Sequence, residues 1–261
     1  MKYCLIILYF ISFNFVQAQN KENVVALVYM NYIHSDLEMV STDHLYLITN
    51  QNKTIYTTGQ RTRRNNIKPD NVDVMVISPS SKADNIYINN NIKDTLYFKH
   101  AVVDNFLYVK EKTPKFIWLL ANEYKEIQGK KLQKATTTFR GRTYTAWCDL
   151  ENPISVGPWK FNNLPGLAYE ITDDAKDYYN EWYLTQIDND VTVNLDIYSL
   201  DKFKKLELKE YVNKSDELKE IATSISNTRT LDIPGLEEIG SATTKINHRI
   251  KAQEIKYEWE R

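Results

Sequence analysis

Cys148 is the side chain with the clearest capacity for nucleophilic chemistry. A cysteine enzyme needs a histidine within hydrogen-bond reach to form its thiolate. The four histidines share no short motif with it or with one another: His34, His44, His100 and His248. Residue alternation places Cys148 on one strand face with Tyr144 and Ala146, a pattern typical of a buried structural thiol. We therefore predict no catalytic residue, and a hydrolase of unknown substrate that uses Cys148 stays as the alternative.

A short acidic segment is the best candidate for a metal site. Asp173, Asp174 and Asp177 lie close together, and calcium prefers carboxylate oxygens as ligands. The segment lacks the glycine and the distal glutamate of a helix-loop-helix calcium site, and the scattered histidines do not suit a transition metal. A polar turn is the favoured interpretation, and calcium binding at these three carboxylates is left open. The expectation is no metal and no cofactor.

A basic segment could hold phosphate or an anionic glycan. It contains Arg61, Arg63, Arg64 and Lys68. No aromatic residue for base stacking lies among them, which favours a solvated loop. The chain carries 33 basic and 34 acidic residues and a formal net charge of −1. This balance gives no indication of nucleic-acid binding.

Residues 1–18 have the pattern of a secretory signal peptide, in which a lysine precedes an apolar run and small side chains at Val16 and Ala18 suit cleavage before Gln19. The run is shorter than the roughly 20 apolar residues that a membrane-spanning helix needs. We therefore expect export to the periplasm or cell envelope, or secretion, with no transmembrane segment after cleavage. Residues 19–261 contain no long linker and are expected to form a single β-rich domain.

Apolar residues recur mostly with a period of two, and the chain has 18 tyrosines, 9 phenylalanines and 5 tryptophans but only 7 glycines. This pattern favours β-strands with packed faces. Short polar gaps predict antiparallel pairing, since parallel neighbours need a crossover of about a dozen residues. We expect a mainly β fold: a large antiparallel, twisted sheet, or a partly open barrel or sandwich, with one or two C-terminal helices packed on it. The expected strands span residues 24–33, 44–49, 72–77, 85–88, 95–100, 105–110, 116–127, 131–139, 142–149, 167–172, 180–187 and 191–200.

Two helices are expected towards the C-terminus. The first spans residues 216–226, with Ser215 as its N-cap. Its packing stripe consists of Leu218, Ile221, Ala222 and Ile225. The second spans residues 241–253, and residues 254–260 alternate as a last strand would.

One motif connects the chain to a known family. Residues 160–171 read KFNNLPGLAYEI, behind a tryptophan and a Gly-Pro segment. In these positions the chain resembles the GLPGLI family, exported bacterial proteins of unknown biochemical function. Asn163 stands at the first glycine of that motif, Ala168 at its isoleucine, and Leu132 where a cysteine is common. The resemblance brings no catalytic residue, and its marker positions here are Trp147, Gly157, Pro158, Lys160, Phe161, Asn163, Leu164, Pro165, Gly166 and Leu167.

The same motif is expected to form a tight structural corner over residues 164–167. Pro165 fixes its own φ, and Gly166 is expected to adopt the positive φ of a type II turn. Asn163 tolerates a positive φ better than other non-glycine residues. The interpretation is a structural motif and not an active site.

The expected function is that of a non-catalytic binding or interaction module of the cell envelope. The expected partner is an apolar ligand or another envelope protein, and a structural component of a surface assembly is a further alternative. An apolar concavity in the fold would favour a ligand, whereas an exposed apolar patch would favour a protein partner.

Overall fold

The computed structural model describes residues 24–35, 38–64, 85–176, 178–230 and 253–260. The expected signal peptide and the expected strand over 72–77 lie outside the described residues. So does the expected helix over 241–253, apart from Gln253.

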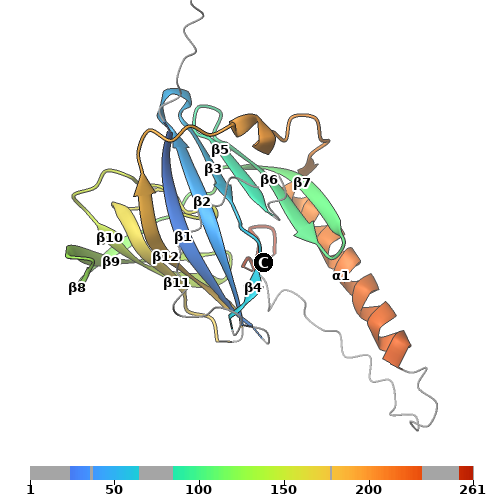
Figure 1. The fold of residues 1–261 in the computed structure, drawn as a ribbon. Helices are drawn as coiled ribbons and strands as arrows, with labels where there is room; N and C mark the ends of the chain where they lie inside the picture. Colours follow the sequence, from blue (N-terminus) through green and yellow to red (C-terminus); the bar gives the residue numbers. More distant parts are fainter. Residues whose placement is uncertain (1–23, 36–37, 65–84, 177, 231–252, 261) are drawn as a thin grey trace, which may run out of the picture.

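Thirteen strands of the described chain pair into one large sheet (Figure 1). They are β1 (Val24–His34), β2 (Met39–Ile48), β3 (Lys53–Thr57), β4 (Thr62–Arg63), β5 (Ile86–Asn90), β6 (Thr95–Val102), β7 (Asn105–Lys112), β8 (Leu119–Ile127), β9 (Lys130–Phe139), β10 (Arg142–Asp149), β11 (Leu167–Asp173), β12 (Tyr179–Asp188) and β13 (Leu206–Glu207). Their order across the sheet is β13-β7-β6-β5-β3-β2-β1-β12-β11-β10-β9-β8, with β4 beside β2. Neighbours are antiparallel except for β13 and β7. The expected fold class is therefore confirmed.

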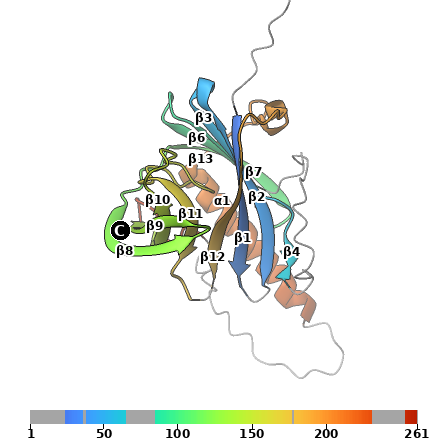
Figure 2. The same cartoon turned by 60° about the vertical axis from the view of Figure 1, so that its left-hand side comes forward.

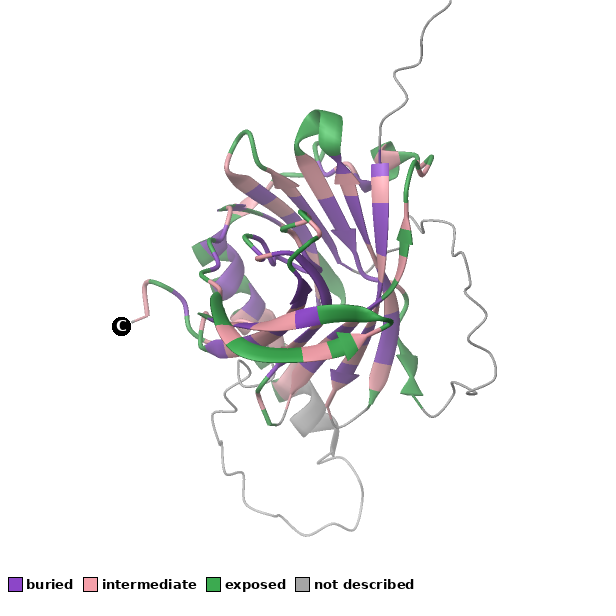
Figure 3. Cartoon of the chain, turned by 90° about the vertical axis from the view of Figure 1, so that its left-hand side faces the viewer, coloured by how far each residue is buried: buried purple, intermediate pink, exposed green. Residues whose placement is uncertain are grey.

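The sheet twists and curves around a concave face, on which helix α1 (Leu208–Thr230) lies (Figures 1 and 2). Side chains of successive strand residues point to opposite faces, so each strand contributes to two separate apolar cores. On β1, Leu27 and Tyr29 belong to the core of the concave face, whereas Ala26 belongs to the core of the convex face. Figure 3 shows this alternation as bands of buried and partly exposed residues along the strands.

Residues 191–200 cover the convex face without forming the strand expected there. They contain a short 3₁₀ helix, η3 (Leu195–Tyr198), which begins where the Asn194 side chain accepts a hydrogen bond of 3.1 Å from the Asp196 N–H. The ring of the buried Tyr198 stacks on that of Tyr46 at 5.9 Å. Val191 and Val193 pack on a sheet face, and the Val191 N–H donates a single hydrogen bond of 3.0 Å to the carbonyl of Val24 at the start of β1.

Residues 254–260 also do not form the expected strand. The N–H groups of Ile255 and Lys256 both donate to the carbonyl of Arg140, at 2.9 and 3.0 Å. No ladder continues from these two bonds, and residues 253–260 contain no strand. The segment then turns, with the N–H of Glu260 bonded to the carbonyl of Tyr257 at 3.0 Å.

Two short strands between residues 49 and 72 were not expected, namely β3 and β4. β3 contains only two strongly apolar residues, Ile55 and Tyr56, so it lacks the longer apolar alternation that predicts a strand. β4 lies within the basic segment that was interpreted as a solvated loop. There Arg64 forms an ion pair of 3.5 Å with Glu38, both side chains being largely exposed.

Helix α1 begins at Leu208, earlier than expected, so Ser215 lies inside the helix and is not its N-cap. The face that packs on the sheet consists of Leu208, Tyr211, Val212 and Ser215, all buried. Ile221, which the sequence placed on the packing stripe, is 47% exposed, although Leu218 does contact the core. The stripe prediction holds at Leu218 and is wrong at Ile221, because the helix packs on the sheet near its start and then extends beyond it (Figure 1). The side chain of Ile225 lies outside the described residues.

The corner after β10 has a different geometry from the expected type II turn. Positive φ occurs at Trp159 (54°) and Asn163 (53°), and Gly166 is not among the residues with positive φ. A Cβ on Gly166 would lie 2.1 Å from the carbonyl oxygen of Asp149, so this glycine is required for close approach of two backbones. The prediction for Asn163 is confirmed, and that for Gly166 was wrong.

Candidate functional site

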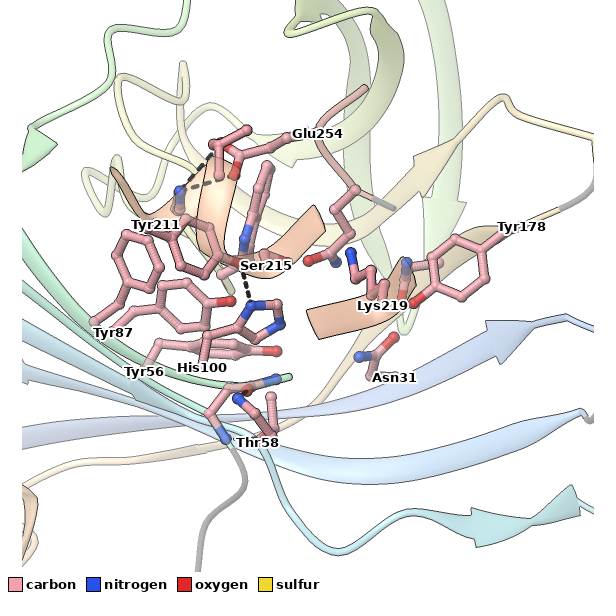
Figure 4. A pocket seen from close by; sticks show the side chains of 18 of the residues that line it. Asn31, Tyr56, Thr58, Tyr87, His100, Tyr178, Tyr211, Ser215, Lys219 and Glu254 are labelled. Atoms are coloured by element: carbon pink, nitrogen blue, oxygen red, sulfur yellow. Dashed lines mark hydrogen bonds and ion pairs between the residues drawn. The ribbon is translucent and has the colours of Figure 1, made fainter. Parts of the chain in front are cut away.

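A pocket of about 240 Å³ opens between the concave face of the sheet, the first turns of α1 and the segment over residues 253–260 (Figure 4). The sheet contributes residues of β1, β3, β5, β6 and β12, and α1 contributes Tyr211, Ser215 and Lys219. These three recur every fourth residue and therefore lie on one helix face. In Figure 4 the labelled side chains surround a common space, with Tyr56, Tyr87 and His100 on one side and Lys219 and Tyr178 on the other.

His100 and Tyr211 join the sheet to the helix at this pocket. The Tyr211 hydroxyl hydrogen-bonds to Nδ1 of His100. Burial, together with the positive charges of Lys160 and Lys219, lowers the pKa of His100 to about 3. His100 therefore carries no charge near neutral pH.

Asp43 lies beneath the pocket and organises its polar wall. Its carboxylate accepts hydrogen bonds from Ser41 Oγ (2.8 Å), the Gly59 N–H (3.0 Å), Asn31 Nδ2 (3.1 Å) and the Tyr56 hydroxyl. Burial raises the pKa of Asp43, and these four donors act against that rise. Because a carboxylate can only accept, the bond to Nδ2 fixes which way the Asn31 amide points.

Two amide atoms on the neighbouring strands β1 and β12 are left without partners. Asn31 and Asn180 are 4% and 2% exposed, and both line the pocket. Among the described residues, Asn31 Oδ1 and Asn180 Nδ2 are the only buried side-chain polar atoms with no hydrogen-bond partner. The strand register pairs Asn31 with Trp182 and Ile33 with Asn180, so the two asparagines are diagonal neighbours on one sheet face. The two residues therefore belong to the same part of the pocket wall.

Most other polar groups of the pocket wall are already engaged within the protein. Thr58 Oγ1 accepts from the Asn85 N–H at 3.0 Å, and Asn85 Oδ1 accepts from the Ala101 N–H at 3.0 Å. The Tyr56 hydroxyl, which donates to Asp43, also accepts from Nε1 of Trp182 at 3.2 Å. The two asparagines are exceptions in a wall whose hydrogen bonds are otherwise made.

A buried cluster of charges closes one side of the pocket. Lys160 Nζ lies 2.5 Å from Glu111 and 3.1 Å from Glu254, and Arg140 pairs with both carboxylates. Burial would raise the pKa of Glu254, but the charges of Lys160 and Arg140 outweigh it and the pKa is lowered. The cluster joins the segment over residues 253–260 to β7 and to residues 160–171, which we call the family-like motif. It also keeps Glu254 ionised at the pocket wall.

Most residues of the family-like motif lie in the apolar core next to the pocket and do not line it. Of its marker positions, Lys160 lines the pocket directly, next to Trp159. Phe161, Leu164 and Leu167 are buried in the concave core, and Trp147 packs against that core from a partly buried position. Gly157 and Pro158 are buried, Pro165 is half-buried and Asn163 is exposed.

Ala168, which stands at the isoleucine position of the GLPGLI motif, is fully buried. The Tyr29 hydroxyl donates a hydrogen bond of 3.0 Å to its carbonyl, which places the Tyr29 side chain against this position.

Cys148 and the acidic segment lie away from the pocket. Burial raises the pKa of the Cys148 thiol to about 12, and no histidine bonds to it within the described part of the chain. Asp173 forms a buried ion pair of 2.7 Å with Arg142, and Asp174 accepts from the Thr143 N–H at 3.3 Å. Asp177 lies outside the described residues, within which no cluster of ligands suits a metal ion.

The basic segment and the histidines are divided among several places. Arg61 reaches the pocket, whereas Arg63 lies in β4 and Lys68 falls outside the described residues. His34 pairs with Glu38 and Glu181. Of the described histidines, only His100 lines the pocket.

Sequence reasoning missed the two asparagines and the helix face at the pocket. A signal was present in the alternation on β1, where Leu27, Tyr29, Asn31 and Ile33 share the inward face. An amide in such a row must be satisfied by the protein or by something bound to it.

Comparisons with known proteins leave the family open. No family model matches the chain, and no curated protein matches it. Within the described residues, no helix has the length and apolarity needed to cross a membrane.

Three solved structures show a distant similarity to the chain. Two are structures of PNGF-II, in space groups C2 and P21, with 14% sequence identity and TM-scores of 0.47 and 0.45. The similarity covers 75% of this chain in both cases, and 33% and 34% of the respective PNGF-II chains. The third is an uncharacterized conserved protein from Thermus thermophilus, with 6% identity and a TM-score of 0.38, covering 71% of this chain and 91% of that one. The chain thus spans about a third of the length of PNGF-II. Likenesses this distant carry no functional argument.

Proposed function

We propose that the chain is an exported, non-catalytic binding protein of the cell envelope that holds a small polar ligand in the pocket between the sheet and α1. The observation that carries the proposal is the pocket of about 240 Å³, whose wall joins the sheet to α1 and contains polar side chains from both, among them Asn31, Asn180 and Ser215. Polar side chains in a pocket wall bind and orient a small ligand.

The proposal replaces the apolar ligand expected from the sequence by a polar one. An apolar occupant would exclude water from both amides and leave them unsatisfied. The volume lies below the roughly 300 to 1,000 Å³ of pockets that hold drug-sized ligands, so the occupant is a small molecule.

Export and membership of the GLPGLI family are parts of the same proposal. Export rests on the signal-peptide pattern over residues 1–18, and family membership rests on the motif around Pro165. Binding without catalysis is supported by the buried Cys148 thiol, which has a raised pKa and no histidine partner among the described residues.

The proposal is tested by native mass spectrometry of the full mature chain, incubated with the small-molecule fraction of an envelope extract. Ser215→Trp fills the pocket from α1, and Asn180→Ala removes the free donor. Glu217→Trp is the matched control, since its exposed side chain lies on the same helix away from the pocket.

We expect the wild type and Glu217→Trp to retain the same small molecule, and both pocket variants to lose it. Circular dichroism verifies that each variant is folded. Equal retention by wild type and folded Asn180→Ala, or no retention by the wild type, would refute a binding function for this pocket.

A further inference from the structure

The end of the sheet that lies opposite α1 is a second candidate site, separate from the pocket. β8 is the last strand there, and no strand of the described chain pairs along its outer edge (Figure 1). At the other end of the sheet, α1 begins directly after β13 and contacts both β13 and β7. We infer that a second copy of this chain pairs with the outer edge of β8, so that two sheets join across a twofold axis at Leu119.

The first argument is the exposure of large apolar side chains at this edge. Ile117 is 76% exposed, Leu119 66% and Leu120 52%. Successive strand residues point to opposite faces, so Leu119 and Leu120 expose apolar surface on both faces of β8. Leu120 lies opposite Ala135 of β9, which is fully buried. An apolar side chain beside a buried neighbour is exposed here because the sheet ends, and one further strand would cover it.

The second argument is that only one half of β8 is protected against pairing. Edge strands of monomeric proteins are commonly protected by charged side chains or by a β-bulge. The register between β8 and β9 shifts between Leu120 and Tyr124, and Glu123, Lys125 and Glu126 follow closely. Residues 117–121, in contrast, contain no charged side chain. The first half of the strand therefore lacks the protection that the second half has.

The third argument is that residues 117–121 complement themselves. An antiparallel pair of two copies centred on Leu119 places Ile117 opposite Ala121, and Trp118 opposite Leu120, of the second copy. Every pair in this register is apolar. A closed twofold contact of this kind uses the same surface of both chains, as in most homodimers.

The charges that flank this apolar centre are complementary as well. In the same register, Lys115 of one copy approaches Glu123 of the other, and the twofold axis repeats this pair on both sides. Both residues are exposed. Glu123 also pairs with Lys134 of its own strand neighbour at 2.9 Å, so its carboxylate would lie between two lysines. Opposite charges at both ends favour this register and a second copy as the partner.

The first test measures the mass of the full mature chain by analytical ultracentrifugation over a range of concentrations. The wild type is expected to dimerise reversibly, as a contact of modest area would. Leu119→Lys places two like charges at the axis and is expected to weaken dimerisation at least about tenfold. Ile92→Lys is the matched control, because Ile92 is 75% exposed in the turn between β5 and β6, and it should leave dimerisation unchanged.

The second test measures the register. Directly opposite residues of antiparallel strands lie about 4.5 to 5.5 Å apart at Cα, a separation that a disulfide can span. Leu119→Cys is therefore expected to form a covalent dimer on oxidation, whereas Ile92→Cys is not. The native thiol of Cys148 is buried and is retained in both variants.

Charge reversal tests the flanking pairs. Lys115→Glu alone is expected to weaken the dimer severalfold, and addition of Glu123→Lys to the same chain is expected to restore it. Circular dichroism verifies that each variant is folded.

Three results would overturn the inference: a wild type that stays monomeric at its highest soluble concentration, a folded Leu119→Lys variant that dimerises as tightly as the wild type, or a dimer that Leu119→Cys does not cross-link. The residues concerned do not line the pocket, so none of these results bears on the proposed binding function.

Discussion

At the scale of single residues, Gly166 and Asn163 show that neighbouring positions of one motif serve different physical needs. Gly166 permits two backbone segments to touch, because its absent Cβ would overlap the Asp149 carbonyl. Asn163 instead supplies a left-handed turn with a φ of 53°. The two positions therefore respond differently to the addition of a methyl group.

Gly166→Ala is expected to destabilise the protein by about 2 to 3 kcal/mol, the range of overpacking a close contact. Gly129→Ala is the matched control: its φ is +73° but nothing lies near its missing Cβ, so only backbone strain of about 1 kcal/mol is added. Urea unfolding measures both. Equal costs would show that the approach to Asp149 does not matter.

Asn163 occupies a left-handed conformation that glycine adopts freely. Asn163→Gly is expected to stay within about 0.5 kcal/mol of the wild type, because relief of the positive φ offsets the added chain entropy. Asn163→Ala is expected to cost about 1 kcal/mol. The comparison is made by thermal unfolding, and an alanine variant as stable as the glycine variant contradicts the φ argument.

The titration of His100 also belongs to this scale. Its folded pKa of about 3 lies below the reference value of 6.5, so the unfolded chain takes up a proton first as the pH falls. The contribution of His100 to stability is complete above pH 6.5 and is lost as the pH falls towards 3. The charged groups that act on this ring are Lys160, Lys219, Arg61 and Glu254.

Between pH 7 and pH 5, the wild type is expected to lose about 2 kcal/mol through this one group. His100→Asn keeps an acceptor near the Tyr211 hydroxyl and does not titrate, so its stability should fall less over the same range. Urea unfolding at several pH values provides the measurement. Parallel pH profiles for the two proteins would exclude His100 as the source.

At the scale of elements, the buried charge cluster determines where the segment over residues 253–260 lies. Lys160 and Glu111 are 1% and 2% exposed at their side chains, and their separation is 2.5 Å. The cluster joins β7, the corner after β10 and the C-terminal segment. Its charges are mutually compensated, and removal of Lys160 leaves two buried carboxylates that share the single cation Arg140.

Lys160→Met is therefore expected to cost about 3 to 5 kcal/mol, since two carboxylates lose a buried cation. Lys134→Met is the matched control, because Lys134 pairs with Glu123 near the surface at 2.9 Å, and its loss should cost less than about 1 kcal/mol. Denaturant unfolding compares them, and similar losses would mean that the buried cluster contributes little.

At the scale of the whole molecule, the strand-rich architecture was predictable and the pocket was not. Alternation such as that of Leu27 and Tyr29 reveals a packed strand locally, and short polar gaps reveal antiparallel neighbours. The docking face of α1 depends on which turns meet the sheet, so the stripe containing Ile221 was misleading. The pocket depends on register between distant strands, which placed Asn31 beside Asn180 without any shared motif.

The signal-peptide pattern over residues 1–18 gives a further whole-molecule prediction. If residues 1–18 are removed, the protein recovered from the envelope begins at Gln19, which intact-mass measurement and N-terminal peptide mapping can determine. A variant with Val16 and Ala18 replaced by arginine should remain unprocessed, because the cleavage site needs small side chains. Recovery of a chain that still begins at Met1 from the wild type would contradict the signal-peptide assignment.

The charge cluster has a kinetic consequence as well. Its bonds connect residues 49, 94 and 114 positions apart in the chain. Contacts that span such separations form late, after the entropy of closing the intervening loops has been overcome, and they slow folding to the millisecond-to-second range or beyond. The pocket needs both Asn31 on the first described strand and Glu254 near the C-terminus, so no early intermediate contains it. The complete pocket therefore forms only after these distant segments have met.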